Sequence, residues 1–172
     1  AMVCVLSASA QQSVDSRLRE IGERDQSVRQ KIVEAQQRGQ VDSLLYYAEQ
    51  MVSVDAENQA FVSDLIRAGV PDGLSEEAYE AIFLVVDHAD LEFQKRYFRV
   101  MRRAANEGKI ASSSMATLRD RMLMRCNRKQ VYGTQTVGRI TIIEGEQVPQ
   151  QVNYVWPIKR ARRVEERRAE VG

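Results

Sequence analysis

Residues 74–109 read LSEEAYEAIFLVVDHADLEFQKRYFRVMRRAANEGK, and this stretch decides the fold class. Ser75 is a typical helix N-cap, and the two glutamates that follow it suit the positive end of the helix dipole. Residues 81–86 are apolar on almost every side, so this turn belongs in the middle of a core. Because Gly108 stops the helical pattern, the stretch predicts one long helix, or two helices if the chain bends at Asp90.

The segments before and after it carry the same helical signal. Apolar residues three, four or seven positions apart give residues 14–38 one core-facing side, and Gly39 closes that helix. Further helices are expected over residues 41–52, from Asp55 as N-cap to residue 68, and from the serines at 112–114 to about residue 126.

Beyond residue 126 the pattern changes from helix to strand. β-Branched residues dominate VGRITIIEGEQV (137–148), and QVNYVWPI (151–158) resumes the pattern, which predicts antiparallel strands. The uncharged run QVYGTQ (130–135) is the entry to them, and RRVEERRAEV (162–171) can form a final surface helix.

These elements predict a mainly α fold class. The chain has 172 residues, which suits one domain with a real core. We expect a single-domain helical bundle over residues 11–172, with a small C-terminal antiparallel β-hairpin or three-stranded piece at about residues 130–158.

The charge balance limits the classes of partner. The chain carries 25 Lys and Arg against 24 Asp and Glu, so its net charge is only +1. Such a balance gives no general case for nucleic-acid binding, and no nucleic acid is expected as a partner. Electrostatic recognition must be local, which fits a small polar or anionic ligand.

The N-terminus resembles the rear part of a secretory signal peptide. An apolar run leads into Ala8-Ser9-Ala10, the small-x-small pattern that a signal peptidase accepts. Residues 1–10 are therefore expected to be a signal remnant, with the mature chain starting near Gln11 and located in the periplasm or outside the cell. The alternative is an ordinary N-terminus with some apolar residues. No other stretch approaches the roughly 18 apolar residues of a transmembrane segment.

Several kinds of active site are excluded or disfavoured by composition and motif. His88 is the only histidine and Cys126 would be the only cysteine of the mature chain, so a zinc site is disfavoured and no metal is expected. The sequence contains no Gly-x-Ser-x-Gly nucleophile turn, no phosphate-binding loop and no dinucleotide fingerprint. No cofactor is expected.

A distributed set of polar residues remains. His88 follows the apolar turn and could act near neutral pH as an acid or a base, with Gln94 six residues further on. Asp120 and Arg121 lie among apolar neighbours, where a carboxylate can orient an imidazole and a guanidinium can hold an anion. The alternative for His88 is a core histidine whose hydrogen bonds are all satisfied.

The run from Gln130 to Gln135 also has two interpretations. Gly133 can adopt a backbone angle that other residues avoid, so a sharp turn there could present Tyr132, Thr134 and Gln135 to a ligand. The alternative is that the run only begins a strand, with Gln130 and Gln135 bonding the backbone across it.

Taken together, these motifs resemble a bacterial family known only as a domain of unknown function. The resemblance rests on RDQSVR (24–29), Asp55-x-x-Asn58, the segment 69–71, His88-Ala89-Asp90 with Gln94, Leu118-x-Asp120-Arg121, QVYGTQ (130–135) and VEERRAEVG (164–172). In that family a glycine and often a proline precede the Gln-x-Tyr-Gly-Thr-Gln run, whereas Asn127, Arg128 and Lys129 stand here. The resemblance implies that the polar residues meet in a pocket.

Two functions follow from these residues, and the sequence leaves both open. In a metal-independent hydrolase or transferase, His88 would be general acid or base and Asp120 would orient it. Arg29 and Arg121 would then bind an anionic part of the substrate, and residues 130–135 would add hydrogen-bond donors. In a non-catalytic binding module, the same groups would hold a small ligand or a partner chain.

The basic C-terminal run gives a third interpretation. It contains Lys159, Arg160, Arg162, Arg163, Arg167 and Arg168, which could contact phosphate or lipid headgroups. The alternative is a solvated helix face, because three glutamates are interspersed and no aromatic residue alternates with the cations.

Overall fold

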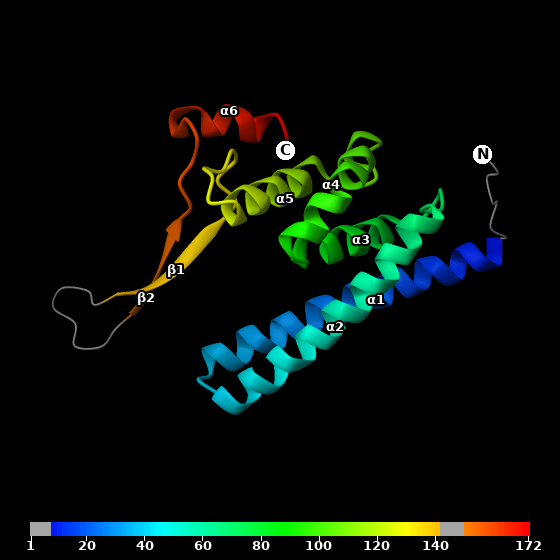
Figure 1. The fold of residues 1–172 in the computed structure, drawn as a ribbon, viewed down its shortest axis with the longest axis horizontal. Coiled ribbons are helices and arrows are strands. Elements are labelled where there is room, and N and C mark those ends of the chain that lie inside the picture. The colour runs from blue at the N-terminus through cyan, green and yellow to red at the C-terminus, as the bar shows by residue number, and fades with distance from the viewer. Residues whose placement is uncertain (1–7, 142–149) are drawn as a thin grey trace. The chain divides into compact units, whose positions relative to one another are not determined.

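The computed structural model describes residues 8–141 and 150–172. These residues form six α-helices, one short 3-10 helix and two antiparallel strands. The mainly α fold class with a small C-terminal hairpin is thereby confirmed (Figure 1). The expected signal remnant falls mostly outside the described residues, and its last three residues begin the first helix.

The chain divides into two compact units, the first ending at Phe93 and the second beginning at Gln94. The single domain expected over residues 11–172 stays a prediction. None of the described helices has the length and apolar character that crossing a membrane requires.

The first unit is built on an antiparallel pair of long helices, α1 (Ala8–Gln37) and α2 (Val41–Ala68), which lie side by side (Figure 1). The turn between them is the expected one, with Gly39 at a φ of 65°. The third helix, α3 (Glu76–His88), packs against both. Gly22 allows its close approach to α1, since a Cβ there would lie 3.2 Å from the Cβ of Ala81.

The region around Asp55 differs from the prediction. Residues 41–68 form one continuous helix, whereas the sequence indicated a break with Asp55 as the cap of a new helix. Residues 52–54 contain neither glycine nor proline, so nothing stops the helix there. The Asp55 carboxylate instead accepts a hydrogen bond from Arg29 on α1.

The bend after α3 is present. Ser75 caps the start of α3 by accepting a hydrogen bond from the Ala78 backbone at 3.2 Å. His88 is the last residue of α3, and Asp90 caps the next helix, α4 (Leu91–Asn106), by accepting from the Phe93 backbone at 2.8 Å. His88 is thus fixed at the C-terminal end of a buried helix, next to the bend that separates α3 from α4.

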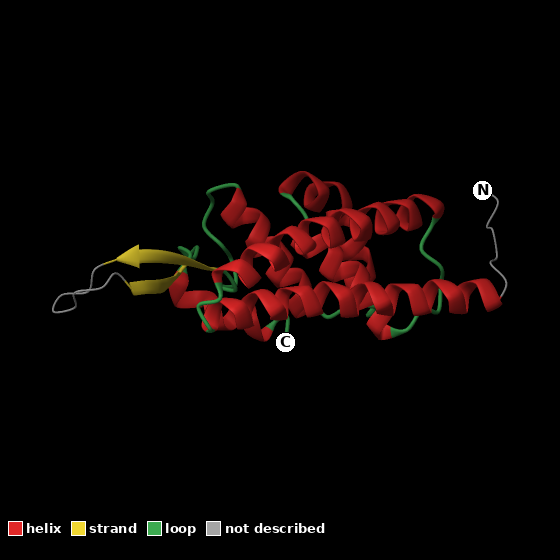
Figure 2. Ribbon diagram, turned by 90° about the horizontal axis from the view of Figure 1, so that it is seen from below, coloured by secondary structure: helices red, strands yellow, loops and turns green. Residues whose placement is uncertain are grey.

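The second unit consists of most of α4 with the elements that follow it. They are α5 (Ser112–Arg125), β1 (Thr136–Thr141), β2 (Gln150–Val155), η1 (Ala161–Arg163) and α6 (Val164–Ala169). The two strands form an antiparallel hairpin in which Val137 pairs with Tyr154 (Figure 2). α5 ends close to the predicted position, and α6 is the expected C-terminal helix.

Candidate functional site

The imidazole of His88 meets two charged side chains of α1. Its Nδ1 lies 2.9 Å from Oδ2 and 3.1 Å from Oδ1 of Asp25, and Nε of Arg29 lies 2.9 Å from the same Nδ1. The Asp25 side chain is only 1% exposed, whereas that of His88 keeps 18% of its surface accessible. The carboxylate is therefore buried behind a ring that reaches the surface.

The two contacts at Nδ1 need opposite proton positions. Arginine Nε always carries a proton, so it can donate to Nδ1 only if that nitrogen is bare. A bare Nδ1 would, however, point its lone pair at an ionised carboxylate 2.9 Å away. Because Arg29 Nε can donate instead to Asp25 Oδ2 at 3.3 Å, we assign the proton of the neutral ring to Nδ1, donating to Asp25. The other nitrogen, Nε2, then carries the lone pair and has no hydrogen-bond partner among the described residues.

Arg29 holds the cluster together, and each of its guanidinium nitrogens has a protein partner. Its Nη2 contacts Oδ1 of Asp25 at 3.1 Å and Oδ1 of Asp55 at 2.8 Å, so it links α1 to α2. Its Nη1 lies 2.9 Å from the sulfur of Met51. Since every guanidinium nitrogen has a protein partner, Arg29 positions the other groups and is less suited to the substrate binding expected of it.

The buried carboxylate of Asp25 is ionised. Burial by itself raises the pKa of Asp25, but hydrogen bonds and charge attraction from His88 and Arg29 outweigh burial and hold that pKa below its ordinary value. With a neutral imidazole, the formal charges of Asp25, Asp55 and Arg29 sum to −1.

Asn58 is a buried polar residue of α2, one turn after Asp55. Its side chain is 2% exposed, and its Nδ2 has no hydrogen-bond partner among the described residues. A buried amide of this kind leaves a donor unsatisfied, which costs stability unless water or a ligand accepts from it.

The sequence indicated His88 and Arg29 but not Asp25. The missed signal is its position, because Asp25 lies four residues after Ile21 and three before Val28, inside the apolar stripe of its helix. Among the described residues no three histidine, cysteine, aspartate or glutamate side chains gather as a metal ion would need.

Asp120, expected to orient His88, has other partners. Its side chain is fully buried on α5, and its oxygens accept from the backbone of Val131 at 2.7 Å, Tyr132 at 2.9 Å and Thr134 at 3.2 Å. The Thr134 hydroxyl lies 3.3 Å from the same carboxylate. The donors that were expected to face a ligand thus face Asp120, and the carboxylate at the imidazole is Asp25.

Gln130 and Gln135 close the same turn. Gln130 is fully buried, and its amide donates to the carbonyls of Gln135 at 3.0 Å and Trp156 at 2.6 Å while accepting from the Gln135 backbone at 2.9 Å. This arrangement matches the structural alternative for these two residues, in which they bond backbone across the entry to a strand.

Two arginines of the C-terminal run donate hydrogen bonds to the backbone of the turn at residues 130–135. Arg167 Nε donates to the Val131 carbonyl and Arg168 Nε to the Tyr132 carbonyl, each at 2.8 Å. Gly133 has a φ of 77°, and a Cβ there would lie 2.8 Å from Ile158 Cδ1 and 2.9 Å from Arg168 Nη2. The motif run, Asp120 and the late arginines therefore form one interlocked structural element.

The residues just before this turn include one in a backbone conformation that favours glycine. Asn127 has a φ of 53°, in the left-handed region that favours glycine and that asparagine tolerates better than most residues. The reversal that a glycine would allow is thus made by asparagine.

The remaining expected residues, Gln94 and Arg121, lie on α4 and α5. Gln94 is buried and Arg121 is half-buried.

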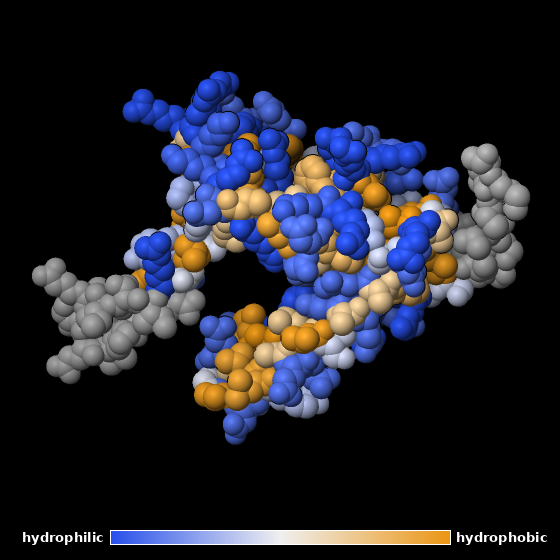
Figure 3. Space-filling view, viewed as in Figure 1, coloured by the Kyte–Doolittle hydropathy of each residue, from blue (hydrophilic) through white to orange (hydrophobic). Residues whose placement is uncertain are grey.

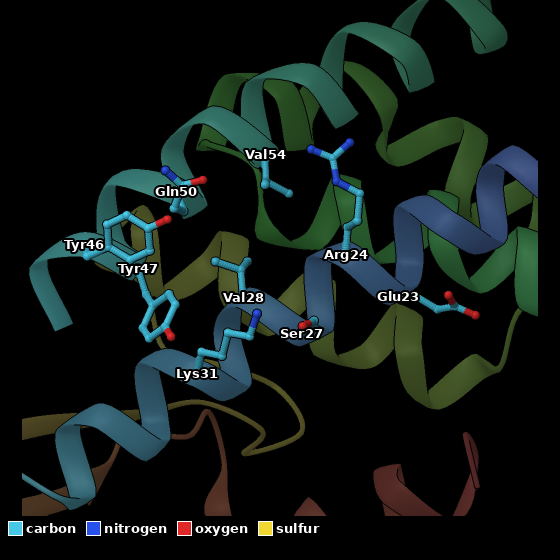
Figure 4. A pocket seen from close by; sticks show the side chains of 9 residues that line it. All are labelled: Glu23, Arg24, Ser27, Val28, Lys31, Tyr46, Tyr47, Gln50 and Val54. Carbon is cyan, nitrogen blue, oxygen red and sulfur yellow. The ribbon is translucent and has the colours of Figure 1, made fainter. Parts of the chain in front are cut away.

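A separate cavity of about 410 Å³ lies between α1 and α2. Figure 4 shows its side chains, which come from both helices; the ammonium of Lys31 on α1 lies 5.7 Å from the ring centre of Tyr47 on α2. Arg24, at its other end, pairs with Glu57 at 2.9 Å. Apolar side chains gather beyond it, at the end of the helix pair near the Gly39 turn (Figure 3).

Comparison with known proteins identifies a family without an assigned activity. Residues 12–172 match the model of a family described as "Family of unknown function (DUF6624)". No curated protein and no solved structure matches the chain.

Proposed function

We propose that this chain, which belongs to the family of unknown function DUF6624, is a metal-independent hydrolase or group transferase with His88 as its general base. The observation that carries the proposal is the contact between Nδ1 of His88 and the buried carboxylate of Asp25 at 2.9 Å. A carboxylate behind Nδ1 fixes the ring and leaves Nε2 as the proton acceptor.

In the reaction, Nε2 takes a proton from water or from a hydroxyl group while its oxygen attacks the electrophilic centre of the substrate. The imidazolium then returns the proton to the leaving group. Asp25 stabilises the imidazolium through Nδ1–H, as the orienting carboxylate does in other acid–base dyads. The formal charge of −1 on the three neighbours Asp25, Arg29 and Asp55 adds to that stabilisation.

Arg29 and Asn58 take supporting roles in this proposal. Arg29 is a positioning residue, because it ties Asp25 to Asp55 and has no guanidinium nitrogen left over. Asn58 offers a buried amide donor with no partner among the described residues, which suits an oxygen of the substrate or a bound water.

The first test uses the fact that His88 is the only histidine. Nitrogen-15 NMR of the imidazole, on protein freed of any histidine tag, gives the protonation of each ring nitrogen without assignment. We expect a proton on Nδ1 in the neutral ring, and a shift toward the Nε2-protonated form in Asp25→Asn. The matched control is Asp64→Asn, on the exposed face of α2. A bare Nδ1 in the unaltered protein would refute the dyad.

The second test measures turnover. A panel of chromogenic carboxylic esters, phosphoesters and glycosides is offered to the protein, with Asp64→Asn as control. For any substrate that is turned over, His88→Ala should lower kcat by about 100- to 10,000-fold, the range of general acid–base catalysis. Unchanged turnover in His88→Ala would sink the proposal.

A non-catalytic binding module is the second candidate, favoured by the cavity between α1 and α2. Its lining combines the cations of Arg24 and Lys31 with the rings of Tyr46 and Tyr47. In that case a small anionic ligand should bind equally well to His88→Ala but less tightly to Lys31→Ala. Calorimetric titration of both variants separates the two functions.

Export is part of the proposal, motivated by Ala8-Ser9-Ala10. Expression with a complete leader in a Gram-negative host, followed by N-terminal sequencing of the periplasmic protein, should give a mature chain that begins near Gln11. Recovery of uncleaved protein from the cytoplasm alone would argue against export.

A further inference from the structure

The second unit carries a groove of about 450 Å³ at the base of its hairpin, and none of its lining residues is among those discussed as catalytic. Three segments far apart in the sequence line it: the residues that follow α5, one face of β1, and the end of β2 with the residues beyond it. The groove therefore exists only once the hairpin has folded back onto the end of α5.

Its charge is of one sign. Arg128, Lys129 and Arg139 line the groove, and no aspartate or glutamate is among its described lining residues. Within the described part of the chain none of these three cations forms an ion pair, whereas Arg103, Arg163 and Arg168 of the same unit each pair with a glutamate. Three uncompensated cations around one concave surface favour an anionic occupant.

Two aromatic rings stand beside these cations. Tyr154 pairs with Val137 across the hairpin, and Trp156 lies two residues further on the same side of the chain. Both side chains line the groove, so aromatic surface is available there for a planar base. Among the described residues neither ring packs on another aromatic ring.

The groove is held in place by the turn described above. The indole nitrogen of Trp156 donates to the Arg128 carbonyl at 2.8 Å, and its backbone carbonyl accepts from the buried Gln130 amide at 2.6 Å. Its backbone N–H donates to Gln135 at 2.9 Å. Because the ring of Trp156 and the chain at Arg128 are tied together, the cations and the aromatic surface keep a fixed relation.

We propose that this groove binds a nucleotide, free or within a single strand, with the phosphate at Arg128, Lys129 and Arg139 and the base against Tyr154 and Trp156. Cations that follow a phosphate and rings that stack on a base are the two components of single-strand recognition. The proposal goes beyond the enzymatic function and does not depend on it. It also departs from the expectation of no nucleic acid, which rested on overall charge and on one local run.

The experiment uses Trp156, which is the only tryptophan, as its own reporter. The protein is titrated with adenosine monophosphate and with oligothymidylate while its fluorescence is recorded. Adenosine and inorganic phosphate, the two parts of the mononucleotide, are titrated separately. We expect saturable quenching by the mononucleotide, by the strand, or by both, that weakens as salt is raised. Binding of the mononucleotide identifies a free nucleotide as sufficient, and binding of the strand alone identifies a polynucleotide.

The variants assign the binding to the groove. Tyr154→Ala should weaken it by about tenfold or more, the loss typical of a removed stacking ring, while Tyr154→Phe keeps it. Arg139→Ala should weaken it by about fivefold. Arg38→Ala, an exposed cation at the end of α1, is the matched control and should change nothing. Circular dichroism of each variant confirms that the fold is kept, and His88→Ala should bind as the unaltered protein does.

Three outcomes would overturn the proposal. If no saturable quenching occurs, nothing binds beside Trp156. If inorganic phosphate competes as well as the nucleotide, the groove is a simple anion site without base recognition. If polyglutamate binds, nucleotides do not, and Tyr154→Ala has no effect, the partner is an acidic polypeptide.

Discussion

Two buried aspartates of this protein, Asp25 in the first unit and Asp120 in the second, have opposite surroundings, while a third, Asp87, lies on α3. Asp120 accepts hydrogen bonds from three backbone N–H groups and one hydroxyl of a nearby turn. Asp25 contacts two side chains that carry or can take a charge, His88 and Arg29. A carboxylate whose partners are backbone N–H groups holds a turn in place, whereas one that contacts an imidazole can stabilise that ring when it takes up a proton. Burial alone therefore does not distinguish a structural group from a catalytic one.

The largest expected effect tests the structural side of this contrast. Asp120→Ala leaves three backbone donors without their acceptor, and each buried unsatisfied group costs about 1–3 kcal/mol. We expect the free energy of unfolding of the second unit to fall by about 4 kcal/mol or more. Urea unfolding followed by Trp156 fluorescence measures it, because that residue bonds into the same turn. An effect below about 1 kcal/mol would mean that water replaces the carboxylate as acceptor and that the turn does not depend on Asp120.

Asp25→Asn should have an intermediate effect and a distinct pH dependence. Removing one partner of a buried ion pair costs about 3–5 kcal/mol. The pKa of Asp25 is lower in the folded chain than its ordinary value of 3.8, so the unfolded chain binds the proton more readily. The stability that the carboxylate contributes is therefore complete at neutral pH and is lost as the pH falls below 3.8.

The measurement compares urea unfolding of Asp25→Asn and the unaltered protein between neutral pH and about pH 3, a window set by linkage to this carboxyl. The difference in unfolding free energy should shrink on the acid side. A difference that stays constant over this range would show that Asp25 has the same proton affinity folded and unfolded.

The smallest effect concerns the outer shell of the turn. Arg168→Ala removes a donor to the Tyr132 carbonyl and should cost about 1 kcal/mol, the net worth of one hydrogen bond. Arg163→Ala is the matched control, because Arg163 pairs only with the exposed Glu166, and no measurable change is expected. Thermal unfolding followed by Trp156 fluorescence compares the two. Equal effects would show that the hydrogen bond from Arg168 to the Tyr132 carbonyl does not stabilise the turn.

Much of the helical framework could be predicted from local signals. The Ser75 cap, the Gly39 turn and the Asp90 bend depend on residues close in sequence, and all three are present. The prediction was wrong at Asp55, where a good capping residue lies inside a continuous helix. Capping propensity is a weak local preference, and the packing of α2 against α1 outweighs it.

The candidate site was only half predictable. The lone histidine after an apolar turn pointed to His88, but Asp120 was chosen as its partner because it lies next to an arginine among apolar residues. Nothing in the spacing of residues 25, 88 and 120 shows which carboxylate meets the ring, since these positions lie on different helices. Asp25 could have been suspected from its place in an apolar stripe, although its partner could not.

The sequence by itself therefore determined the mainly α class and the breaks between most helices, because these depend on backbone preferences and on apolar periodicity. Only the tertiary structure decided that Asp25 faces His88, that Asp120 and two distant arginines close the Gln130–Gln135 turn, and that three cations and two rings meet in one groove. Hydrogen bonds and charge pairs act over a few ångströms, so the partner of each polar group is fixed only when the chain brings distant segments together.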